Sequence, residues 1–571
     1  MNRPENMPYK KWVVAPVVPE TLTQAQVHRN PILIQVLYNR GIKDPDEVTT
    51  FLDRHYIGAT DPFKLADMDR AVARIKQAID QDEMIVVYGD FDADGVTSTV
   101  LLVEALRGLG LPRGQVRPYI PDRVDEGYGL NHEALQSLKE GGAELVISVD
   151  CGIRSIAEVS QATILGLDMI VTDHHSLGTE LPPAVAVINP KRPDSTYPEE
   201  MLAGVGIAYK VAQALKQAIP ERARYETETL LDLVALGTVA DLAPLLGENR
   251  QLVMDGLRVL NQGQRPGVAA LAKVAGLTPG NMTAESIAFG LGPRLNAAGR
   301  LAHAYDAARL LAVNNDRMAK DYAQTLDQLN RQRQQLTKEL SQRAEEMIEP
   351  GAPLLLAADP SFVGGIVGLI ASRLADKHYR PAIVLEQGEL ISRGSCRSIP
   401  GFHITDALDK LAWLLVKHGG HAQAAGFTIE NKNLAEFHER MLAIAAEELD
   451  EEAMTPSIPV DAEMAIGAVD WALFDQLKQL EPTGNANAAP LFMSHDVHVY
   501  SHRAVGQDGA HLQLWVGDGQ TKVQCIAFRQ GLWAGRLPDQ VDLVYTINVN
   551  EWNGNSNLQL MVKDIREVTI E

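Results

Sequence analysis

Long apolar runs are absent from the 571-residue sequence. No stretch approaches the ~20 consecutive apolar residues that a helix needs to cross a bilayer. The N-terminus opens on the polar residues Met1-Asn-Arg-Pro-Glu-Asn and lacks the apolar segment of a secretory signal. We therefore expect a soluble, cytoplasmic protein that makes no contact with a membrane.

Cysteine is scarce as well. Cys151, Cys396 and Cys525 lie far apart, and no CxxC pair occurs anywhere. This spacing excludes a zinc ribbon and a disulfide framework, and it suits a reducing compartment.

Common phosphate-binding motifs are also missing. The sequence has no GxxxxGKS or GxxxxGKT loop, and Gly204-Val-Gly206 lacks the third glycine of a dinucleotide-binding loop. An ATP-driven motor and a Rossmann dehydrogenase are therefore disfavoured. No serine or cysteine stands out as an activated nucleophile, so water is the simplest attacking group.

Positive charge is in short supply, because the formal net charge is -22. Proteins that bind nucleic acid mainly by neutralising phosphates are usually basic, so non-specific duplex binding is disfavoured. Carboxylates gathered around metal ions, however, lose their repulsion when the ions bind. A narrow groove can also be basic on an acidic surface, and a nuclease therefore stays open.

The length predicts three or four domains, because one hydrophobic core does not serve so long a chain. Residues 84–275 alternate short apolar runs with helical patterns, as βαβ units do. Three runs rich in β-branched residues predict buried parallel strands: residues 84–89, 144–149 and 168–172.

The remaining segments predict a helical connector, a second α/β domain and a barrel. Within residues 276–350, apolar side chains at helical spacing from Met318 to Met347 predict one long amphipathic helix. Residues 351–455 read as α/β. Short strand patterns at 456–571, with a hairpin turn at Asn553-Gly554, predict a small OB-like barrel. Residues 1–80 form an N-terminal extension.

A carboxylate cluster, Asp90-Phe-Asp92-Ala-Asp94-Gly95, follows the first predicted strand. Carboxylates at alternate positions converge on a hard cation more readily than they stay unpaired, although a solvated turn stays open. The cluster also resembles the start of an EF-hand loop. That loop needs glutamate at its twelfth position, which is Leu101 here, so the calcium-loop interpretation fails.

Three further clusters follow apolar runs: Asp150, Asp173-His174-His175 and Asp241. Each alone would be an ordinary turn, capping or surface residue. In an open parallel sheet, however, the C-terminal strand ends share one crevice, so we expect Asp150 and His174 to converge with Asp92 and Asp94. Oxygen and imidazole ligands without thiolate suit Mn²⁺ or Mg²⁺. One carboxylate bridging two such ions would make a two-metal site for phosphoryl chemistry.

Taken together, the Asp90–Gly95 cluster and Asp173-His174-His175 resemble the DHH phosphoesterase superfamily. Gly419-Gly420-His421 resembles the GGH motif of the DHHA1 domain that accompanies it. Three segments are similar to the RecJ family in particular: residues 230–245, 292–301 and 394–399.

The resemblance implies a fold and an activity. A DHH domain at 81–275 and a DHHA1 domain at 351–455 would face each other across a cleft, joined by the long helix. A nucleic-acid-binding OB-like barrel would follow at 456–571. The implied activity is that of a 5′→3′ exonuclease on single-stranded DNA, with two Mn²⁺ or Mg²⁺ ions, in DNA repair and recombination. A single-strand DNA-binding protein as partner follows from family analogy alone.

The resemblance also implies the metal ligands. Asp150 would bridge both ions and Asp92 would bind one of them, while Asp94, His174 and Asp241 would complete the other.

Two neighbouring positions carry separate expectations. Small-molecule members of the superfamily usually have histidine four residues before Asp92; here that residue is Tyr88, and Asp90 is the candidate replacement. His175 would support the ligands or contact phosphate.

Substrate contacts are expected from several polar residues. Ser395 and Arg397 would hold a phosphate, because guanidinium binds phosphate oxygens in pairs, and Arg123 would assist. Ordinary surface ion pairs are the alternative for these arginines. The family motifs add four further candidates, with His421 at the scissile phosphate: Arg294, Asn296, Gly420 and His421.

Two other functions stay open. A DHH–DHHA1 phosphodiesterase acting on short oligonucleotides or cyclic dinucleotides would share the motifs, but such relatives are typically much shorter and lack the barrel. A non-catalytic Cdc45-like replication scaffold would have decayed metal motifs, whereas only Tyr88 departs from the pattern here. In the barrel, Tyr500, Trp515 and Trp552 are expected in the core, with base stacking as the alternative.

Overall fold

The computed structural model describes residues 9–53, 60–123, 126–127, 129–552 and 555–568. The chain divides into two compact units. The larger unit spans residues 58–454, and the smaller unit combines the N-terminal residues up to 57 with residues 455–571.

The larger unit begins with a five-stranded parallel sheet, which confirms the predicted α/β fold. Its strands, in spatial order, are β3 (Val116–Tyr119), β2 (Ile85–Tyr88), β4 (Leu145–Val149), β5 (Asp168–Thr172) and β6 (Ala186–Ile188). The central strands β2 and β4 are buried along their whole length because helices cover both faces. Three of these strands match the three predicted runs.

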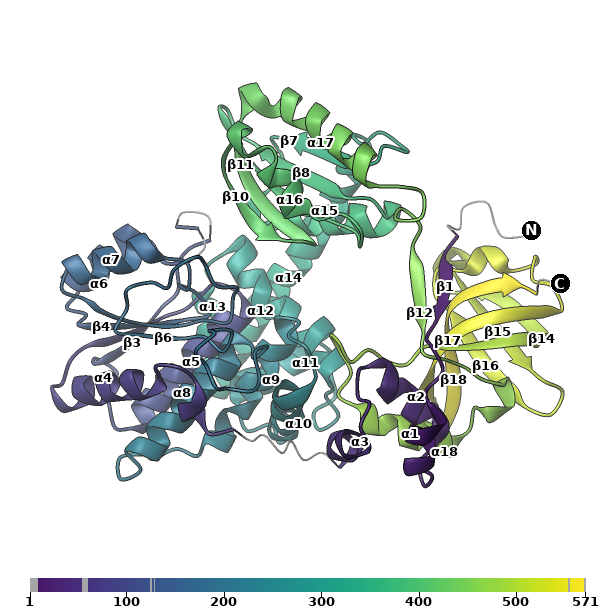
Figure 1. Ribbon diagram of the computed structural model, residues 1–571, viewed down its shortest axis with the longest axis horizontal. Helices are drawn as coiled ribbons and strands as arrows, with labels where there is room; N and C mark the ends of the chain where they lie inside the picture. Colours follow the sequence, from purple (N-terminus) through teal and green to yellow (C-terminus); the bar gives the residue numbers. More distant parts are fainter. Residues whose placement is uncertain (1–8, 54–59, 124–125, 128, 553–554, 569–571) are drawn as a thin grey trace. The chain divides into compact units, whose positions relative to one another are not determined.

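Alternate residues of β2 show how the two faces are covered. Ile85 and Val87 join the core formed with helices on one face, whereas Val86 and Tyr88 join a separate core on the other. The first face packs on α4 (Met68–Asp80), α5 (Ala93–Gly108) and α8 (Gly204–Ala218). The second packs on α6 (His132–Glu140) and α7 (Ile156–Ile164), as Figure 1 shows.

A helical layer follows the sheet. It contains α9 (Leu231–Ala240), α10 (Gly247–Leu260), α11 (Pro266–Val274), the π-helix η3 (Ser286–Leu291), α12 (Gly292–Leu301) and α13 (Tyr305–Ala312). The predicted long helix is α14 (Asp316–Glu345), whose first turn is capped by the Asn315 side chain. It packs on α11, α12 and α13 and then on α15 of the second domain, so it joins the two domains (Figure 1).

The second domain is built on a mixed sheet. Its strands, in spatial order, are β10 (Leu415–His421), β11 (Ala424–Glu430), β9 (Ile391–Arg397), β8 (Ala382–Gln387) and β7 (Leu355–Asp359). Only β7 and β8 are parallel, and α15 (Gly364–His378) connects them. α16 (Ile404–Asp409) and α17 (Leu434–Glu448) contribute to a separate core of this domain.

The smaller unit contains the predicted barrel. Its ring runs β14 (Phe492–Val505), β15 (His511–Gly517), β16 (Lys522–Ala527), β18 (Asn555–Glu567) and β17 (Gln540–Trp552). Because β17 also pairs with β14, the ring closes and leaves no open edge. β17 and β18 pair antiparallel, while Asn553-Gly554 lies outside the described residues.

The structure divides the segment that we treated as one N-terminal extension, residues 1–80. β1 (Lys11–Val14) pairs with β12 (Ser457–Val460), and α2 (Pro31–Asn39) buries its apolar residues in the barrel core. The Trp12 Nε1 donates to Asp564 Oδ2 at 2.9 Å. α4, in contrast, packs against α8 and β6 of the larger unit. The segment divides because the apolar face of α2 is buried in the barrel core, whereas the apolar face of α4 is buried in the core of the larger unit.

The membrane and disulfide expectations concern the helices and the three cysteines. Across the described ranges, no helix is both long and apolar enough to span a membrane. Cys151, Cys396 and Cys525 are all free thiols and all buried. The three cysteines thus have no structural role as disulfides.

Candidate two-metal centre

The loop after β2 places three carboxylates at the start of α5. Asp92 caps this helix, because its Oδ1 accepts hydrogen bonds from the N–H groups of Asp94 and Gly95, both at 3.0 Å. A Cβ on Gly95 would lie 2.6 Å from the backbone of Asp90, so only glycine lets the loop fold over the helix. The helix N-terminus also favours the negative charges gathered there.

Two other helices approach these carboxylates closely. At the N-terminus of α8, the N–H groups of Gly204 and Val205 donate to the two Asp94 oxygens at 2.7 and 2.9 Å. A Cβ on Gly204 would lie 2.8 Å from Asp150 Oδ1, and one on Gly237 of α9 would lie 2.8 Å from Asp94 Oδ1. Both glycines therefore make room for a carboxylate.

Asp150 lies at the end of β4 in an unusual backbone conformation. Its φ is +60°, a left-handed value that non-glycine residues adopt rarely and mostly at functional sites. Its N–H donates to the Thr172 carbonyl at 3.0 Å, which holds the turn against β5. Its Oδ1 lies 3.1 Å from the Nε2 of His174, which follows β5.

The structure brings all six predicted metal ligands together. Asp90, Asp92 and Asp150 form one group of ligand atoms within 4.8 Å of one another, and Asp94, His174 and Asp241 form a second. Asp150 connects the groups through its contact with His174. Asp241 reaches the centre from the end of a helix, α9, rather than from a strand.

The unsatisfied atoms of the centre fit divalent cations. Among the described residues, the buried Asp90 Oδ1, Asp150 Oδ1 and His174 Nε2 have no hydrogen-bond partner. An unpaired buried carboxylate costs several kcal/mol, which a bound cation offsets. Carboxylate oxygens with one imidazole suit Mn²⁺ or Mg²⁺.

The ionisation of these side chains reflects their crowding. Burial, together with the negative charges of neighbouring aspartates, raises the pKa of Asp94 to about 7 and that of Asp241 to about 9. The same two causes raise the pKa of Asp90 and Asp150 well above the usual range. Burial lowers the pKa of His174 to about 3, so its imidazole is neutral, as a metal ligand must be.

Tyr88 lies apart from the centre. Its side chain is buried on the α6–α7 face, where the hydroxyl donates to the Gly129 carbonyl at 3.0 Å and accepts from Asn131 Nδ2 at 3.2 Å. Asp90 instead joins the first ligand group. Of the two residues, Asp90 therefore lies at the centre and Tyr88 does not.

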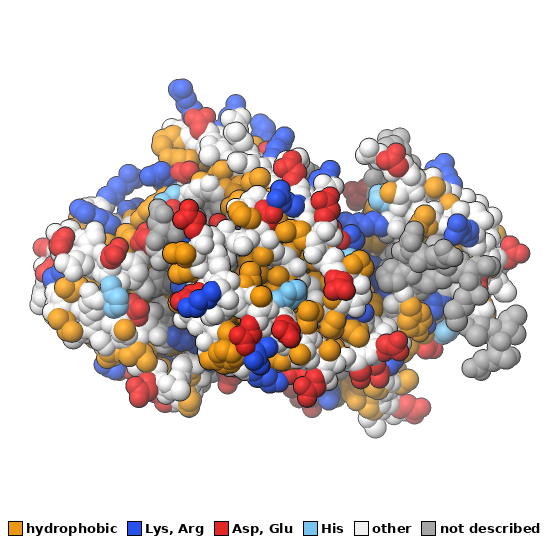
Figure 2. Space-filling view, turned by 90° about the horizontal axis from the view of Figure 1, so that it is seen from above, with side chains coloured by type: hydrophobic (Ala, Val, Ile, Leu, Met, Phe, Trp, Pro, Cys, Tyr) orange, Lys and Arg blue, Asp and Glu red, His pale blue; other side chains and the backbone are white. Residues whose placement is uncertain are grey.

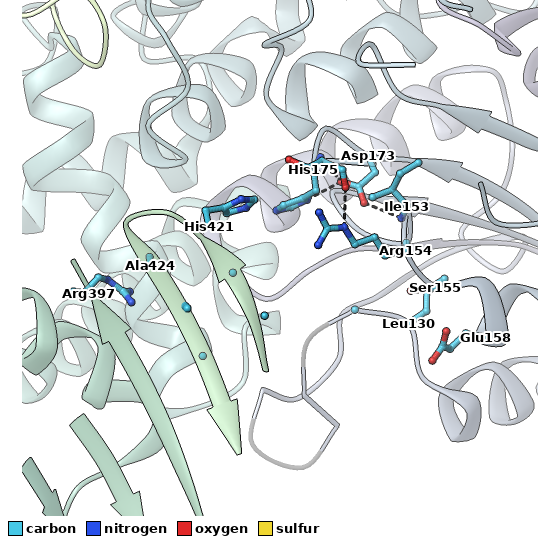
Figure 3. A pocket seen from close by; sticks show the side chains of 17 residues that line it. Leu130, Ile153, Arg154, Ser155, Glu158, Asp173, His175, Arg397, His421 and Ala424 are labelled. Atoms are coloured by element: carbon cyan, nitrogen blue, oxygen red, sulfur yellow. Dashed lines mark hydrogen bonds and ion pairs between the residues drawn. The ribbon is translucent and has the colours of Figure 1, made fainter. Parts of the chain in front are cut away.

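His175 lines a cavity and also lies at the centre, because with Asp150 and His174 it forms a third group of ligand atoms within 4.8 Å of one another. Its Nδ1 lies 2.7 Å from Asp173 Oδ1, while Asp173 Oδ2 accepts from the Ile153 N–H at 2.9 Å. Burial opposes the charging of His175, but the bond to Asp173 raises its pKa. Figure 3 shows His421 of the second domain pointing toward His175. Burial and the positive charge of Arg154 lower the pKa of His421.

A cationic cavity of about 400 Å³ lies between the two domains of the larger unit. Ser395, one carboxylate (Glu386) and four arginines line it: Arg123, Arg300, Arg393 and Arg397. The Arg397 Nη1 donates to Ser395 Oγ at 3.2 Å. On the face drawn in Figure 2, basic and acidic side chains are interspersed. Positive charge is therefore more concentrated in this cavity than on the face drawn in Figure 2.

Two predicted substrate residues are placed elsewhere. Arg294 pairs with Asp327, at 2.9 Å from its Nη2, and donates to the Gly290 carbonyl. Asn296 Oδ1 accepts from the Ala93 N–H at 2.8 Å. Neither residue lines the cavity beside His175 or the cationic cavity. Arg294 ties α12 to α14, and Asn296 positions the carboxylate loop.

Other residues at the site were missed from the sequence. Arg154 lies beside His175, and the Lys191 Nζ donates to the His174 carbonyl. Both follow strands, β4 and β6, so the rule that found the carboxylates also applies to them. Arg300 lies within a RecJ-like segment, but only the fold shows that it faces the cavity.

Comparison with protein families agrees with this architecture. The chain matches the DHH family N-terminal domain over residues 84–238, the DHHA1 domain over 351–449 and the RecJ OB domain over 460–564.

Individual relatives match almost the whole chain. The single-stranded-DNA-specific exonuclease RecJ of Bacillus subtilis is 38% identical over 95% of this chain and 69% of that protein. That of Dickeya dadantii is 36% identical over 94% and 96%. The crystal structure of RecJ in complex with Mn²⁺ from Thermus thermophilus is 30% identical, with a TM-score of 0.85 over 98% of this chain and 80% of that chain.

Binding of divalent ions should depend on pH in a predictable direction. The folded, metal-free protein keeps protons on Asp94 and Asp241 up to pH values of about 7 and 9, above the ordinary aspartate range. Its stability therefore falls as the pH rises from 6.5 to 9, a window in which His174 is already neutral. Mn²⁺ should raise the melting temperature by a few degrees, and more at pH 9 than at pH 6.5.

Differential scanning fluorimetry of the full chain, in EDTA and in Mn²⁺ at both pH values, measures this effect. Asp241→Asn should flatten the pH dependence, whereas Asp321→Asn on the exposed face of α14 should not. A Mn²⁺ shift that is equal at both pH values would contradict the assignment.

Proposed function

The chain belongs to the RecJ family of single-stranded-DNA-specific exonucleases, and from this premise we propose that it hydrolyses single-stranded DNA from the 5′ end, in DNA repair and recombination. The observation that supports the proposal best is the pair of ligand groups linked by Asp150 at the carboxyl edge of the sheet. Two Mn²⁺ or Mg²⁺ ions are the proposed cofactors.

Two ions bound there would supply a metal-activated water and stabilise the charge that develops on the phosphate. Hydrolysis forms a bond from the water oxygen to phosphorus and breaks the bond from phosphorus to the 3′ oxygen, which leaves with a proton from solvent. Asp173 orients His175 toward the cavity, and His421 faces it from the other domain. We assign these two histidines to the scissile phosphate.

The cationic cavity accounts for the direction of attack. We propose that Arg123, Arg300, Ser395 and Arg397 hold the 5′-terminal phosphate, because paired guanidinium donors match phosphate oxygens. Burial lowers the pKa of both Arg123 and Arg300, while the negative charge of Asp92 acts to raise it. The cavity therefore adjoins the first ligand group. A chain end seated there places the next phosphodiester at the metals.

The size of the cavities offers a reason for strand specificity. Both are lined by residues of the two facing domains of the larger unit. At about 770 and 400 Å³ they have the size of sites for single small molecules, which is small for a base pair with both of its strands. We therefore propose that a duplex is excluded sterically.

The barrel carries a second proposed contact with DNA. Tyr500 and Trp515 were expected in the core, but their side chains are 39% and 38% exposed. The Lys522 ammonium lies over both rings, at 5.0 and 5.5 Å. Aromatic rings beside a cation form a platform for bases and phosphates. The side chain of Trp552 lies outside the described residues.

The other candidate functions have less support. A phosphodiesterase for short oligonucleotides would not need the barrel, and a Cdc45-like scaffold would not need a complete set of ligands. A single-strand DNA-binding protein is proposed as a partner on family resemblance alone. The free buried cysteines favour a reducing, cytoplasmic location.

The exonuclease activity should depend on metal and on Asp150. With end-labelled single strands, we expect nucleotide release in Mn²⁺ and none in EDTA. Asp150→Ala should lower the rate about 10³-fold or more, because it removes the carboxylate shared by both ligand groups. Asp321→Ala is the matched control. Equal degradation of a blunt duplex would contradict the steric explanation.

Preference for a 5′-phosphorylated strand should depend on Arg397. We expect the protein to prefer 5′-phosphorylated over 5′-hydroxyl strands, and Arg397→Ala to reduce this preference about 10- to 100-fold, the usual effect of losing a charged hydrogen bond. Arg440→Ala, on the exposed face of α17, should leave the preference unchanged. An unchanged preference in Arg397→Ala would rule out this seat for the phosphate.

DNA binding by the barrel should depend on the exposed aromatic pair. Trp515→Ala should weaken binding of a labelled oligothymidylate about 5- to 100-fold, as expected for the loss of one stacked base. Fluorescence anisotropy in EDTA measures binding without cleavage. Trp471→Ala removes an equally exposed tryptophan of the same unit and serves as the control. Equal losses in the two variants would contradict a stacking role.

A further inference from the structure

A second cavity, of about 770 Å³, adjoins the metal centre and is lined by the two domains of the larger unit (Figure 3). Five of its lining residues are glycines, which present only backbone to the cavity: Gly129, Gly152, Gly419, Gly420 and Gly426. We refer to it as the glycine-lined cavity.

The fold does not require two of these glycines. Gly419 and Gly426 lie on strands β10 and β11, and neither has a left-handed φ. A Cβ on Gly419 would meet nothing within 4 Å, and one on Gly426 would make only an ordinary contact at 3.6 Å. Glycine weakens a strand relative to alanine, because it loses more conformational freedom on folding. The missing side chains therefore keep space open in the cavity, not in the protein core.

The two cavities are neighbours that differ in charge. Arg397 and Gly426 line both, so a group held in one cavity lies next to the other. The cationic cavity is lined by four arginines and one carboxylate, Glu386, whereas the glycine-lined cavity is lined by two arginines and two carboxylates, Glu158 and Asp173. A phosphate is better placed in the first, and an uncharged ring system in the second.

The volume exceeds the need of an ordinary nucleoside. Sites of about 300–1,000 Å³ accommodate drug-sized ligands, which are larger than a nucleoside, and the glycine-lined cavity lies in the upper part of that range. At the five glycines, no side chain restricts the size of a ring that enters the cavity.

We propose that the glycine-lined cavity receives the sugar and base of the 5′-terminal nucleotide and admits bases enlarged by covalent modification. The enzyme then releases modified as well as ordinary terminal nucleotides. The inference rests on the proposed exonuclease function, and it assigns Gly419 and Gly426 as the residues that determine tolerance of the terminal base.

The test compares two 5′-phosphorylated single strands in Mn²⁺. One begins with thymidine, and the other with deoxyuridine that carries a naphthyl group on C5. Wild-type protein should release the two terminal nucleotides at rates within about threefold of each other, since the added group meets no selective contact. Gly419→Leu should lower the ratio of modified to ordinary release about tenfold or more, because the new side chain fills the cavity.

The controls separate the possible outcomes. Gly114→Leu makes the same change at an exposed glycine with open space around it and should leave both rates unchanged. If Gly419→Leu loses both activities, the series Gly419→Ala and Gly419→Val must still show the ratio falling with side-chain size. A ratio that stays constant along the series overturns the inference.

Failure of the inference is distinguishable from failure of the proposed function. If wild-type protein degrades the ordinary strand but stops at the naphthyl nucleotide, the inference is wrong while the exonuclease proposal stands. If the ordinary strand is not degraded in Mn²⁺ at all, the proposed function itself fails.

Discussion

Mutual repulsion among buried carboxylates is the constraint on which the rest of this structure depends. Asp90, Asp94 and Asp150 are almost fully buried within a few ångströms of like charges, and unpaired oxygens remain on two of them. Such an arrangement is unfavourable in a folded protein unless protons or cations neutralise it. The helices around the centre act against that repulsion even before a cation binds. α8 donates two N–H groups to Asp94, and α5 presents its N-terminus to the same region.

The same constraint explains the small residues nearby. Helix N-termini can reach a carboxylate only if no side chain intervenes, and Gly95, Gly204 and Gly237 meet this need. These glycines have no chemistry of their own, yet each sets how closely one element approaches the ligands. We infer that substitution at any of them would disturb the metal centre through backbone displacement rather than through loss of a ligand.

Much of this fold and site followed from the sequence, for physical reasons that are local. Buried parallel strands are continuous apolar runs, and the residues that end them must share one edge, so the convergence of Asp92, Asp150 and His174 could be predicted. The apolar run before Asp241 has no periodicity that distinguishes strand from helix, and it is a fully buried helix. Pairing of β1 with β12 joins residues more than 400 positions apart, for which no local pattern exists.

The direction in which a side chain points could not be predicted from the sequence either. Arg294 and Asn296 belong to a segment that resembles a nuclease family, but resemblance does not say where a side chain points. In the structure they hold α14 and the carboxylate loop in place. Arg300, from the same helix α12, instead faces the cationic cavity. Residues of one motif can therefore divide between supporting the fold and lining a cavity.

The separation of charge within the larger unit resolves the apparent conflict between an acidic protein and a polyanionic substrate. Negative charge is concentrated where cations can neutralise it, and positive charge is concentrated in the enclosed cavity beside it. Interactions between charges in such a partly buried cavity are screened less by salt than those on an open surface. A net charge of -22 disfavours broad contact with a duplex, whereas the cavity presents four arginines and one glutamate to whatever enters it. Under the proposed function, selectivity for a strand end would follow from where the charges lie, and the sign of their sum would not oppose it.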